Sequence, residues 1–329
     1  MPEAGDPATD KSEIKELYLL SFNYLAKFTD MKKAVLVLFV LIIPMIGIGQ
    51  RWKRYRYEAV GGVGISNFLG ELGGANQIGT NYFRDLELSA TRHALMVGLR
   101  YKLNLYSALR TTFTYGMVSG NDNLTTEATR ANRNLHFKAP IYEFSTQFEA
   151  SWMKDKTGHR YRLRGVRGQK GFELYYYGFV GIGAFYYNPK AKWSGDGKWY
   201  ALQPLGTEGQ GLDPARDKYS RFSVAIPIGF GARHSMGRNA AIGIELGIRK
   251  TFTDYIDDVS TTYYSSSAIS SNAGNELAGD LADPSNGDNP TWTAPGQQRG
   301  DPTDKDSYMF ALISFNYKLR TTRGNKPKF

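Results

Sequence analysis

The feature that most constrains the fold is a two-residue alternation of apolar with small or polar side chains, which recurs along the chain. In the clearest segment, Leu95, Val97 and Leu99 alternate with residues that include Arg100 and Lys102. Successive side chains of a β-strand point to opposite faces, so this pattern predicts a strand with one apolar face. Strands of this kind span membranes when they close into a barrel, with the apolar face toward lipid.

Eight segments carry the pattern, and the connections between them differ in length. We predict strands at 57–66, 93–103, 108–117, 141–153, 172–187, 222–230, 242–248 and 309–317. Long connections rich in Gly, Asn, Asp, Ser and Pro are expected at 67–92, 119–137, 188–219 and 257–306, tight ones at 104–105 and 235–239, and an intermediate one at 154–170. Long loops outside the cell alternate with short periplasmic turns in outer-membrane barrels. The sequence therefore predicts an all-β fold, an eight-stranded antiparallel transmembrane β-barrel with both termini in the periplasm.

Two strands are less regular than the others. Segment 172–187 is aromatic on both faces, so the pattern does not assign its register. Pro227 interrupts a strand pattern and cannot donate to a ladder of hydrogen bonds, so we expect a bulge there. A soluble β-sandwich is the structural alternative, although it seldom needs a loop as long as 257–306.

The composition agrees with a barrel and excludes some chemistry. The chain has 329 residues and no cysteine, which rules out disulfides, thiolate zinc sites and iron–sulfur clusters. Its mean hydropathy of −0.42 is far from that of a helical membrane protein. A barrel is polar on average, because only alternate strand residues face lipid.

The start of the chain contains a predicted targeting segment. Met31-Lys32-Lys33 precedes the apolar run 34–48, a pattern typical of a secretory signal peptide, with cleavage expected after Gly49. We therefore divide the chain into an N-terminal extension at 1–30, a signal peptide at 31–49 and a barrel domain at 50–329. The extension is interpreted as an upstream start codon chosen in error, with translation beginning at Met31. The alternative is a genuine cytoplasmic extension, which would make the apolar run an uncleaved anchor.

Charge is distributed unevenly between the two predicted ends. The last long loop is acidic, whereas the predicted periplasmic segments are basic. One hypothesis is that this basic rim docks an acidic partner, because complementary charge steers association. The alternative is that the charges serve solubility and membrane orientation. The predicted docking residues are Lys154, Lys156, Arg160, Arg162, Arg164, Arg167, Lys170, Lys318, Arg320, Arg323 and Lys326.

A second group of charges lies on the predicted inner face of the strands. Buried charges need partners, and an eight-stranded barrel is about wide enough for side chains to fill it. We therefore predict a paired network that plugs the lumen, with a proton or ion path as the alternative. Its members are Arg100, Arg110, Glu143, Glu149, Glu245 and Arg249.

Catalytic motifs are not found in the sequence. There is no P-loop, HExxH, GxSxG or EF-hand loop, and the four histidines are scattered singly. We therefore expect no enzyme activity, no catalytic residue, no cofactor and no metal. A lipid-modifying barrel enzyme is the remaining alternative, and it would need a Ser–His pair at one rim, near His234-Ser235 or His136.

Four short motifs resemble a known family of barrels. They are 64–73 (GISNFLGELG), 132–137 (NRNLHF), 204–211 (PLGTEGQG) and 254–260 (DYIDDVS). Together they resemble the PorG family, outer-membrane barrels of the type IX secretion system in Bacteroidota, and the likeness spans most of 57–320. The residues before Met31 are not part of the pattern.

The resemblance implies a role in protein export without catalysis. Members of that family are thought to tether a periplasmic ring, built from PorK and PorN or GldK and GldN, to the outer membrane. The expected partners are therefore these ring proteins and outer-membrane lipid, with no nucleic acid and no small-molecule substrate. A free-standing structural or adhesin-like barrel is the alternative function.

Overall fold

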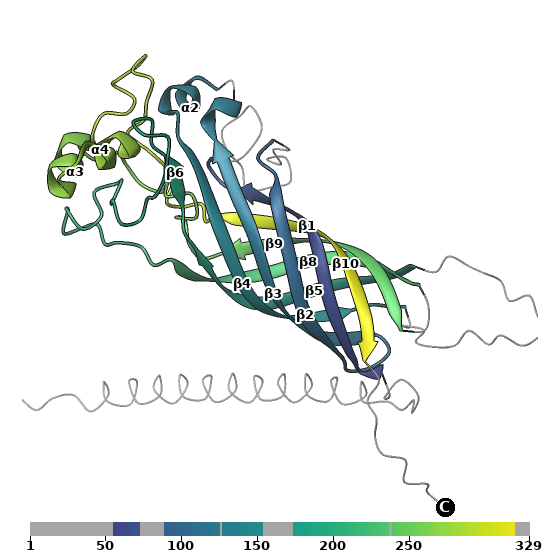
Figure 1. Ribbon diagram of the computed structural model, residues 1–329. Coiled ribbons are helices and arrows are strands. Elements are labelled where there is room, and N and C mark those ends of the chain that lie inside the picture. Colours follow the sequence, from purple (N-terminus) through teal and green to yellow (C-terminus); the bar gives the residue numbers. More distant parts are fainter. Residues whose placement is uncertain (1–54, 73–88, 126, 154–173, 237–238, 320–329) are drawn as a thin grey trace, which may run out of the picture. The chain divides into compact units, whose positions relative to one another are not determined.

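The computed structural model describes residues 55–72, 89–125, 127–153, 174–236 and 239–319, all in the unit Gln50–Phe329. It confirms the predicted fold, an eight-stranded antiparallel barrel (Figure 1). The barrel strands are β1 (Tyr57–Leu69), β2 (Arg92–Lys102), β3 (Ser107–Asn121), β4 (His136–Ala150), β5 (Leu174–Tyr187), β8 (Phe222–Ser235), β9 (Ala240–Thr251) and β10 (Ser307–Leu319). Among the described residues, no helix has the length and apolarity needed to cross a membrane. The predicted signal peptide lies outside the described residues.

Each barrel strand pairs with its neighbours in sequence, and the first strand pairs with the last. β1 is antiparallel to β10 from Tyr57↔Leu319 to Leu69↔Ser307, and β3 pairs with β4 along its length. The order is therefore β3-β2-β1-β10-β9-β8-β5-β4, closed by the β3–β4 pairing. Closure leaves these eight strands without the two separate packed layers of a β-sandwich, so the sandwich alternative is wrong.

The connections differ at the two ends of the barrel. β1 starts and β10 finishes at the end that holds turn 103–106 and the short connection from β8 to β9, where the N–H of Lys102 donates to Arg56 and the N–H of Lys318 to Asn239. The opposite end carries the smaller elements (Figure 1). These are η4 (Asp122–Leu124), α2 (Ala128–Arg133), β6 (Lys190–Lys192), β7 (Trp199–Ala201), α3 (Ser266–Ala273) and α4 (Glu276–Ala282). We call this end the loop end and the other the turn end.

The outer wall of the barrel is apolar. Val97 on β2, Phe144 on β4 and Ile244 on β9 are each about 60 % exposed, although they are large and apolar. Soluble monomers rarely expose a continuous apolar surface of this extent, whereas lipid covers it in a membrane. The further exposed members are Val63, Ile65, Leu95, Leu99, Leu109, Phe113, Phe148, Val180, Ile182, Val224, Ile228, Phe230, Ile242, Ile313 and Phe315.

An apolar cluster fills the lumen toward the loop end. Phe68 and Phe137 pack edge to face at 4.9 Å between ring centroids, and Phe185 packs against Tyr308 at 5.3 Å. Both pairs are buried, together with neighbours such as Ile141. The barrel is therefore closed at this end by its own side chains.

Some predicted details of the strands are wrong. β4 begins at His136 instead of 141, and β3 continues to Asn121, so the second long connection is shorter than predicted. No bulge occurs at Pro227, because β8 keeps one continuous register with β9 from Ala225↔Thr251 to Ser235↔Ala241. On the other side, only the pairing with β5 is interrupted there, since proline lacks an N–H. Met309 has the predicted outward position but is buried.

Candidate functional site

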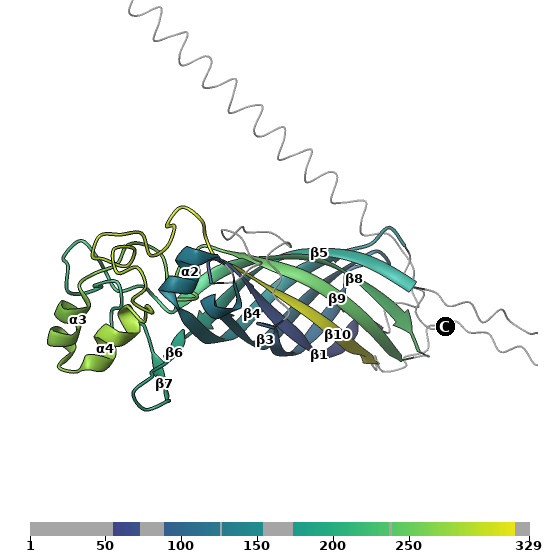
Figure 2. The same ribbon diagram turned by 90° about the horizontal axis from the view of Figure 1, so that it is seen from above.

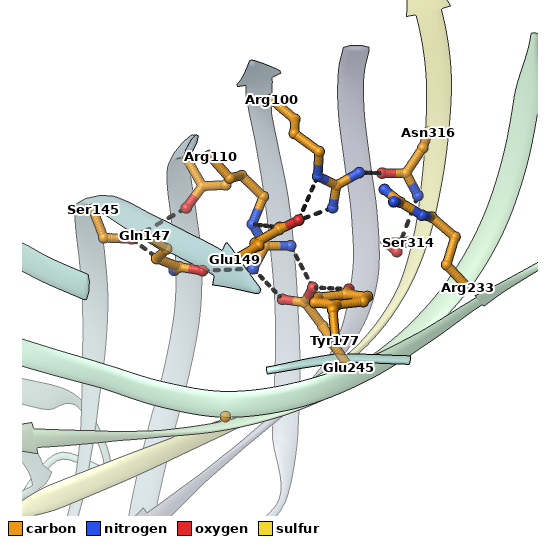
Figure 3. Close-up of polar contacts among 12 residues, drawn as sticks. Arg100, Arg110, Ser145, Gln147, Glu149, Tyr177, Arg233, Glu245, Ser314 and Asn316 are labelled. Atoms are coloured by element: carbon orange, nitrogen blue, oxygen red, sulfur yellow. Dashed lines mark hydrogen bonds and ion pairs between the residues drawn. The ribbon is translucent and has the colours of Figure 1, made fainter. Parts of the chain in front are cut away.

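The centre of the lumen holds Arg100, which binds acceptors from three other strands. Its Nε and Nη2 donate to the two carboxylate oxygens of Glu149 at 2.7 and 2.9 Å. Its Nη1 donates to Glu58 at 3.0 Å. The same Nη1 donates to the amide oxygen of Asn316 at 2.6 Å (Figure 3). β2, β4, β1 and β10 supply these residues, so one guanidinium links four strands across the lumen.

A second guanidinium, that of Arg110 on β3, lies beside the first. Its Nε is 3.0 Å from Glu149, so both arginines share that carboxylate. It also pairs with Glu245 on the opposite wall and donates to Gln147 at 2.5 Å. The hydroxyl of Tyr177 donates to Glu245 at 3.1 Å, which ties β5 into the same group (Figure 3).

Further ion pairs lie on either side of this centre. Toward the loop end, Arg249 Nε is 3.2 Å from Glu143, which also accepts from Tyr308 at 2.9 Å. Toward the turn end, Lys102 Nζ is 2.7 Å and Arg233 Nη1 is 3.3 Å from the carboxylate of Glu58. We call all these groups the lumen network. Its members are Glu58, Arg100, Lys102, Arg110, Glu143, Gln147, Glu149, Tyr177, Arg233, Glu245, Arg249, Tyr308 and Asn316.

The lumen network fills the interior instead of lining a passage. Five cations lie against four carboxylates, and every one of these nine residues is at most 6 % exposed. Paired charges of this kind hold the strands in one arrangement, and breaking a buried pair is costly because it leaves a charge without a partner. Chemically, the network is suited to closing and stiffening the barrel.

All six lumen residues predicted from the sequence lie in this network. Among the charged or aromatic members that the sequence prediction missed are Glu58, Arg233 and Tyr177. Each lies on an inward position of a strand rich in glycine or aromatic residues, where the alternation is weak. Strand parity counted from Tyr57, an exposed residue, would have placed Glu58 inside.

The predicted docking residues lie mostly outside the described residues. This holds for those between 154 and 170 and for Arg320, Arg323 and Lys326. The structure describes Lys318, whose side chain is only 3 % exposed and on the inward face of β10. The prediction that Lys318 presents its charge to a partner is therefore wrong, because its position has inward parity.

The four motifs singled out in the sequence meet at the base of the loop end. Leu72 from the first motif, Leu135 and Phe137 from the second, and Ile256 and Val259 from the fourth belong to one buried cluster. The motifs therefore fix the shape of the loops by packing against one another. We call the loop segments above this cluster, 70–72, 122–135, 188–221 and 252–306, the cap.

Glu208 links the third motif to the fourth. Its carboxylate accepts from the backbone N–H of Ser260 at 2.9 Å and from the hydroxyl of Thr261 at 2.6 Å. Arg299 Nη1 donates to the same carboxylate at 3.1 Å. Thr207 donates to Asp258, which is a second contact between the two motifs. A buried carboxylate with several donors is a rigid junction, because each donor would be left unsatisfied without it.

Carboxyl groups in the cap are buried with few compensating cations. Burial raises the pKa of Glu71 to about 7 and the pKa of Asp254 to about 7. Burial together with neighbouring carboxylates raises the pKa of Asp257 and of Asp306 above their usual range. Within the described ranges, no group of three or more His, Cys, Asp or Glu side chains could hold a metal ion. The cap therefore favours the protonated form of these acids.

A cavity of about 440 Å³ opens in the cap. Arg130 and Arg133 line one side, and Tyr263 and Trp292 line another. Both arginines are held by Asp122, with Nε to carboxylate distances of 3.1 and 2.8 Å. The cavity is large enough for a small ligand and offers both aromatic and polar walls.

His136, one of the residues considered for catalysis, has a structural position. Its Nε2 accepts from the backbone N–H of Lys192 at 3.0 Å, and its ring packs edge to face against Trp199. It therefore holds the β6–β7 hairpin against β4.

The closed strand order, the apolar outer wall and the filled lumen define a small transmembrane β-barrel, a class that bacterial outer membranes contain. No protein-family model matches the chain, and no curated protein sequence matches it.

Solved structures with a similar fold are small outer-membrane barrels. Ail, the attachment invasion locus protein of Yersinia pestis, is 8 % identical over 80 % of this chain and 97 % of its own, with a TM-score of 0.33. The N-terminal barrel domain of Pseudomonas aeruginosa OprF is 10 % identical over 80 % and 98 %, with a TM-score of 0.30. Neisserial surface protein A is 6 % identical over 80 % and 96 %, with a TM-score of 0.33. Similarities this distant carry no argument about the function of this chain.

Proposed function

We propose that this chain is a non-enzymatic outer-membrane barrel that anchors or positions the periplasmic ring of a type IX secretion system. The observation that carries the proposal is the lumen network, because a lumen filled with paired charges leaves the rims and outer wall as working surfaces. Anchoring needs only such surfaces and a stable hold in the membrane.

The orientation in this proposal places the turn end in the periplasm. Short turns and both chain ends lie in the periplasm in bacterial barrels. Here both barrel termini share the end with turn 103–106 and the short β8–β9 connection. The basic segment 154–170 connects β4 to β5 at this same end of the strand order. Its positive charge would then face periplasmic partners.

The assignment to this secretion system rests on the four PorG-like motifs. Their residues build the buried base of the cap and the junction at Glu208, so they specify a shape and not only a composition. The proposed partners are ring proteins of the PorK and PorN or GldK and GldN type. Electrostatic attraction to the basic segment would give the contact its orientation.

The test is mass spectrometry of proteins that co-purify with the tagged barrel from mildly solubilised membranes. One variant carries Arg160→Glu, Arg162→Glu, Arg164→Glu and Arg167→Glu, and a matched control carries Lys at the same four positions. The proposal predicts ring subunits with the native protein and the control, and their loss with the variant. Recovery with all three would refute the basic docking surface, and recovery with none would refute the ring assignment.

The cap cavity favours a second candidate function, an adhesin-like barrel that binds a ligand at the cell surface. Trp292 is 41 % exposed beside the cavity and would be a contact residue. Under this function, Trp292→Ala lowers adhesion of cells that display the barrel, and the four-arginine variant leaves secretion intact. Under the ring function, Trp292→Ala leaves adhesion unchanged and the four-arginine variant impairs secretion.

A further inference from the structure

The β6–β7 hairpin extends the barrel wall beyond the loop end of β4. Lys190 on β6 pairs opposite Lys138 on β4, and Lys192 pairs opposite Trp199 on β7. The hairpin projects away from the barrel beside α4 (Figure 2). Directly paired residues, and residues two apart on one strand, lie on the same face of a sheet. The three lysines therefore share one face.

That face continues the lipid-facing wall. Lys138 has the same strand parity as Tyr142 and Phe144, which are 42 % and 59 % exposed on the outside of the barrel. Three ammonium groups thus lie outside the barrel, directly beyond its apolar surface.

These positive charges are not balanced by neighbouring acids. None of the three lysines forms an ion pair with a carboxylate among the described residues, and Asp196 in the same hairpin pairs instead with Lys198. Lys138 Nζ lies 3.7 Å from the centroid of the Trp199 ring, which holds the ammonium group in place. Like charges directly opposite each other destabilise a strand pair, so a bound anion would stabilise this hairpin.

The three lysines lie at the level along the barrel where lipid headgroups are expected. A row of ring contacts across five strands joins His93, Tyr115, Tyr142, Tyr186 and Phe222 on the outer wall. Aromatic rows of this kind mark the membrane interface. Lys138 is four residues beyond Tyr142, about 13 Å along the strand. For a strand tilted by about 40°, this places it about 10 Å beyond the aromatic row.

We propose that Lys138, Lys190 and Lys192 bind the phosphate groups of an outer-leaflet glycolipid whose acyl chains lie against the apolar wall below. Charge complementarity selects the phosphates, and the wall next to the site selects a lipid over a free anion. The inference goes beyond ring anchoring and shares with it only the orientation of the loop end.

The test measures lipid binding to the purified full chain in detergent by native mass spectrometry. The probes are diphosphoryl lipid A, lipid A without phosphates, and inorganic phosphate as a competitor. The variant carries Lys138→Gln, Lys190→Gln and Lys192→Gln. A matched control carries Lys198→Gln, Lys218→Gln and Lys305→Gln, which removes the same charge from other exposed positions of the cap; Lys198 lies in the same hairpin but pairs with Asp196. A third variant with Arg at 138, 190 and 192 retains the charge, and circular dichroism verifies that every variant is folded.

We expect the native chain, the control and the Arg variant to bind diphosphoryl lipid A at least tenfold more tightly than the Gln variant. Lipid A without phosphates should bind to the native chain as weakly as diphosphoryl lipid A binds to the Gln variant. Equal binding by the Gln variant and the control would overturn the site. Full competition by millimolar inorganic phosphate would overturn the lipid as its occupant. Because the assay uses no ring protein, its failure is distinguishable from failure of the ring proposal.

Discussion

Arg100 and Glu149 form a two-point ion pair across the lumen, with nitrogen to oxygen distances of 2.7 and 2.9 Å and neither residue more than 3 % exposed. Glu149 also faces Arg110, so one carboxylate balances two guanidinium groups. The stability of the barrel therefore depends on this residue more than on any exposed acid.

We predict that Glu149→Gln lowers the free energy of unfolding by about 3–5 kcal/mol, because it leaves two buried guanidinium groups under-compensated. Urea titration of the barrel folded into lipid vesicles measures the change. Glu276→Gln, at an exposed position in the cap, serves as the control and should change it by less than about 0.5 kcal/mol. A loss of less than about 1 kcal/mol for Glu149→Gln would contradict the importance of the network.

Glycine positions on β1 give a second, steric prediction. A Cβ atom at Gly64 would lie 2.0 Å from the backbone oxygen of Ala311 on β10, whereas one at Gly61 would meet nothing within 4 Å. Gly64→Ala should therefore cost about 1–3 kcal/mol by forcing the strands apart. Gly61→Ala, on the same strand, should change the stability by less than about 0.5 kcal/mol. Equal losses of stability for the two variants in the same urea titration would contradict the steric clash at Gly64.

The cap should become less stable as pH rises. The folded-state pKa values of Glu71 and Asp254 are about 7, above those of the unfolded chain. The folded cap thus holds more protons than the unfolded one between about pH 4 and pH 7. Its stabilisation by these protons is complete below about pH 4 and is lost as pH rises through about 7. After correction for the intrinsic exchange rate at each pH, the amides of residues 254–306 should be less protected at pH 8 than at pH 5.

A double variant isolates the cause of this pH dependence. Glu71→Gln with Asp254→Asn keeps the shape of both side chains but removes their titration, so the loss of cap protection between pH 5 and pH 8 should be smaller than in the native chain. Asp304→Asn, at an exposed position, should retain the native difference. A native cap that exchanges more slowly at pH 8, after correction for intrinsic rates, would contradict the prediction.

Removing the Glu208 junction should loosen the cap and leave the barrel intact. Glu208→Ala leaves the buried Arg299 with only the more distant carboxylate of Asp258 at 4.0 Å, and losing the closer pair costs about 3 kcal/mol locally. Limited proteolysis should then cleave within the cap, while the folded barrel still migrates as a compact species in unheated gels. Asp288→Asn, at an exposed position elsewhere in the cap, should resist the protease as the native chain does. Unchanged resistance of Glu208→Ala would show that the motifs do not meet through this residue.

Strand positions could be predicted where the polarity of each side chain matches the lipid or the lumen that it faces. On β2, apolar residues such as Val97 face lipid and polar ones such as Arg100 face the lumen, so the local alternation was sufficient. On β5, Tyr177 and Phe179 lie inside although Tyr176 lies outside. Their inward position depends on Gly229 and Gly231 on the neighbouring strand β8 and on Gly247 on β9, where a Cβ would collide with those rings. This packing of rings over glycines involves residues that are distant in sequence. A local sequence pattern therefore cannot predict it.

The sites were partly predictable for the same reason. Inward charges on regular strands identified six residues of the lumen network, whereas Arg233 lies on a strand whose alternation relies on small residues. The β6–β7 hairpin was not predicted, because its strands have three residues each and depend on pairing with β4. The role of the four motifs also needed the fold, since their contacts form only when the loops meet.

The most direct test of ring anchoring is photo-cross-linking in living cells, with the cross-linking amino acid placed either at Arg164 in the 154–170 segment or at Lys198 in the β6–β7 hairpin. The proposal predicts cross-links to a periplasmic ring subunit from position 164 and none from position 198. Cross-links to ring subunits from position 198, or from neither position while the ring remains assembled, would contradict it.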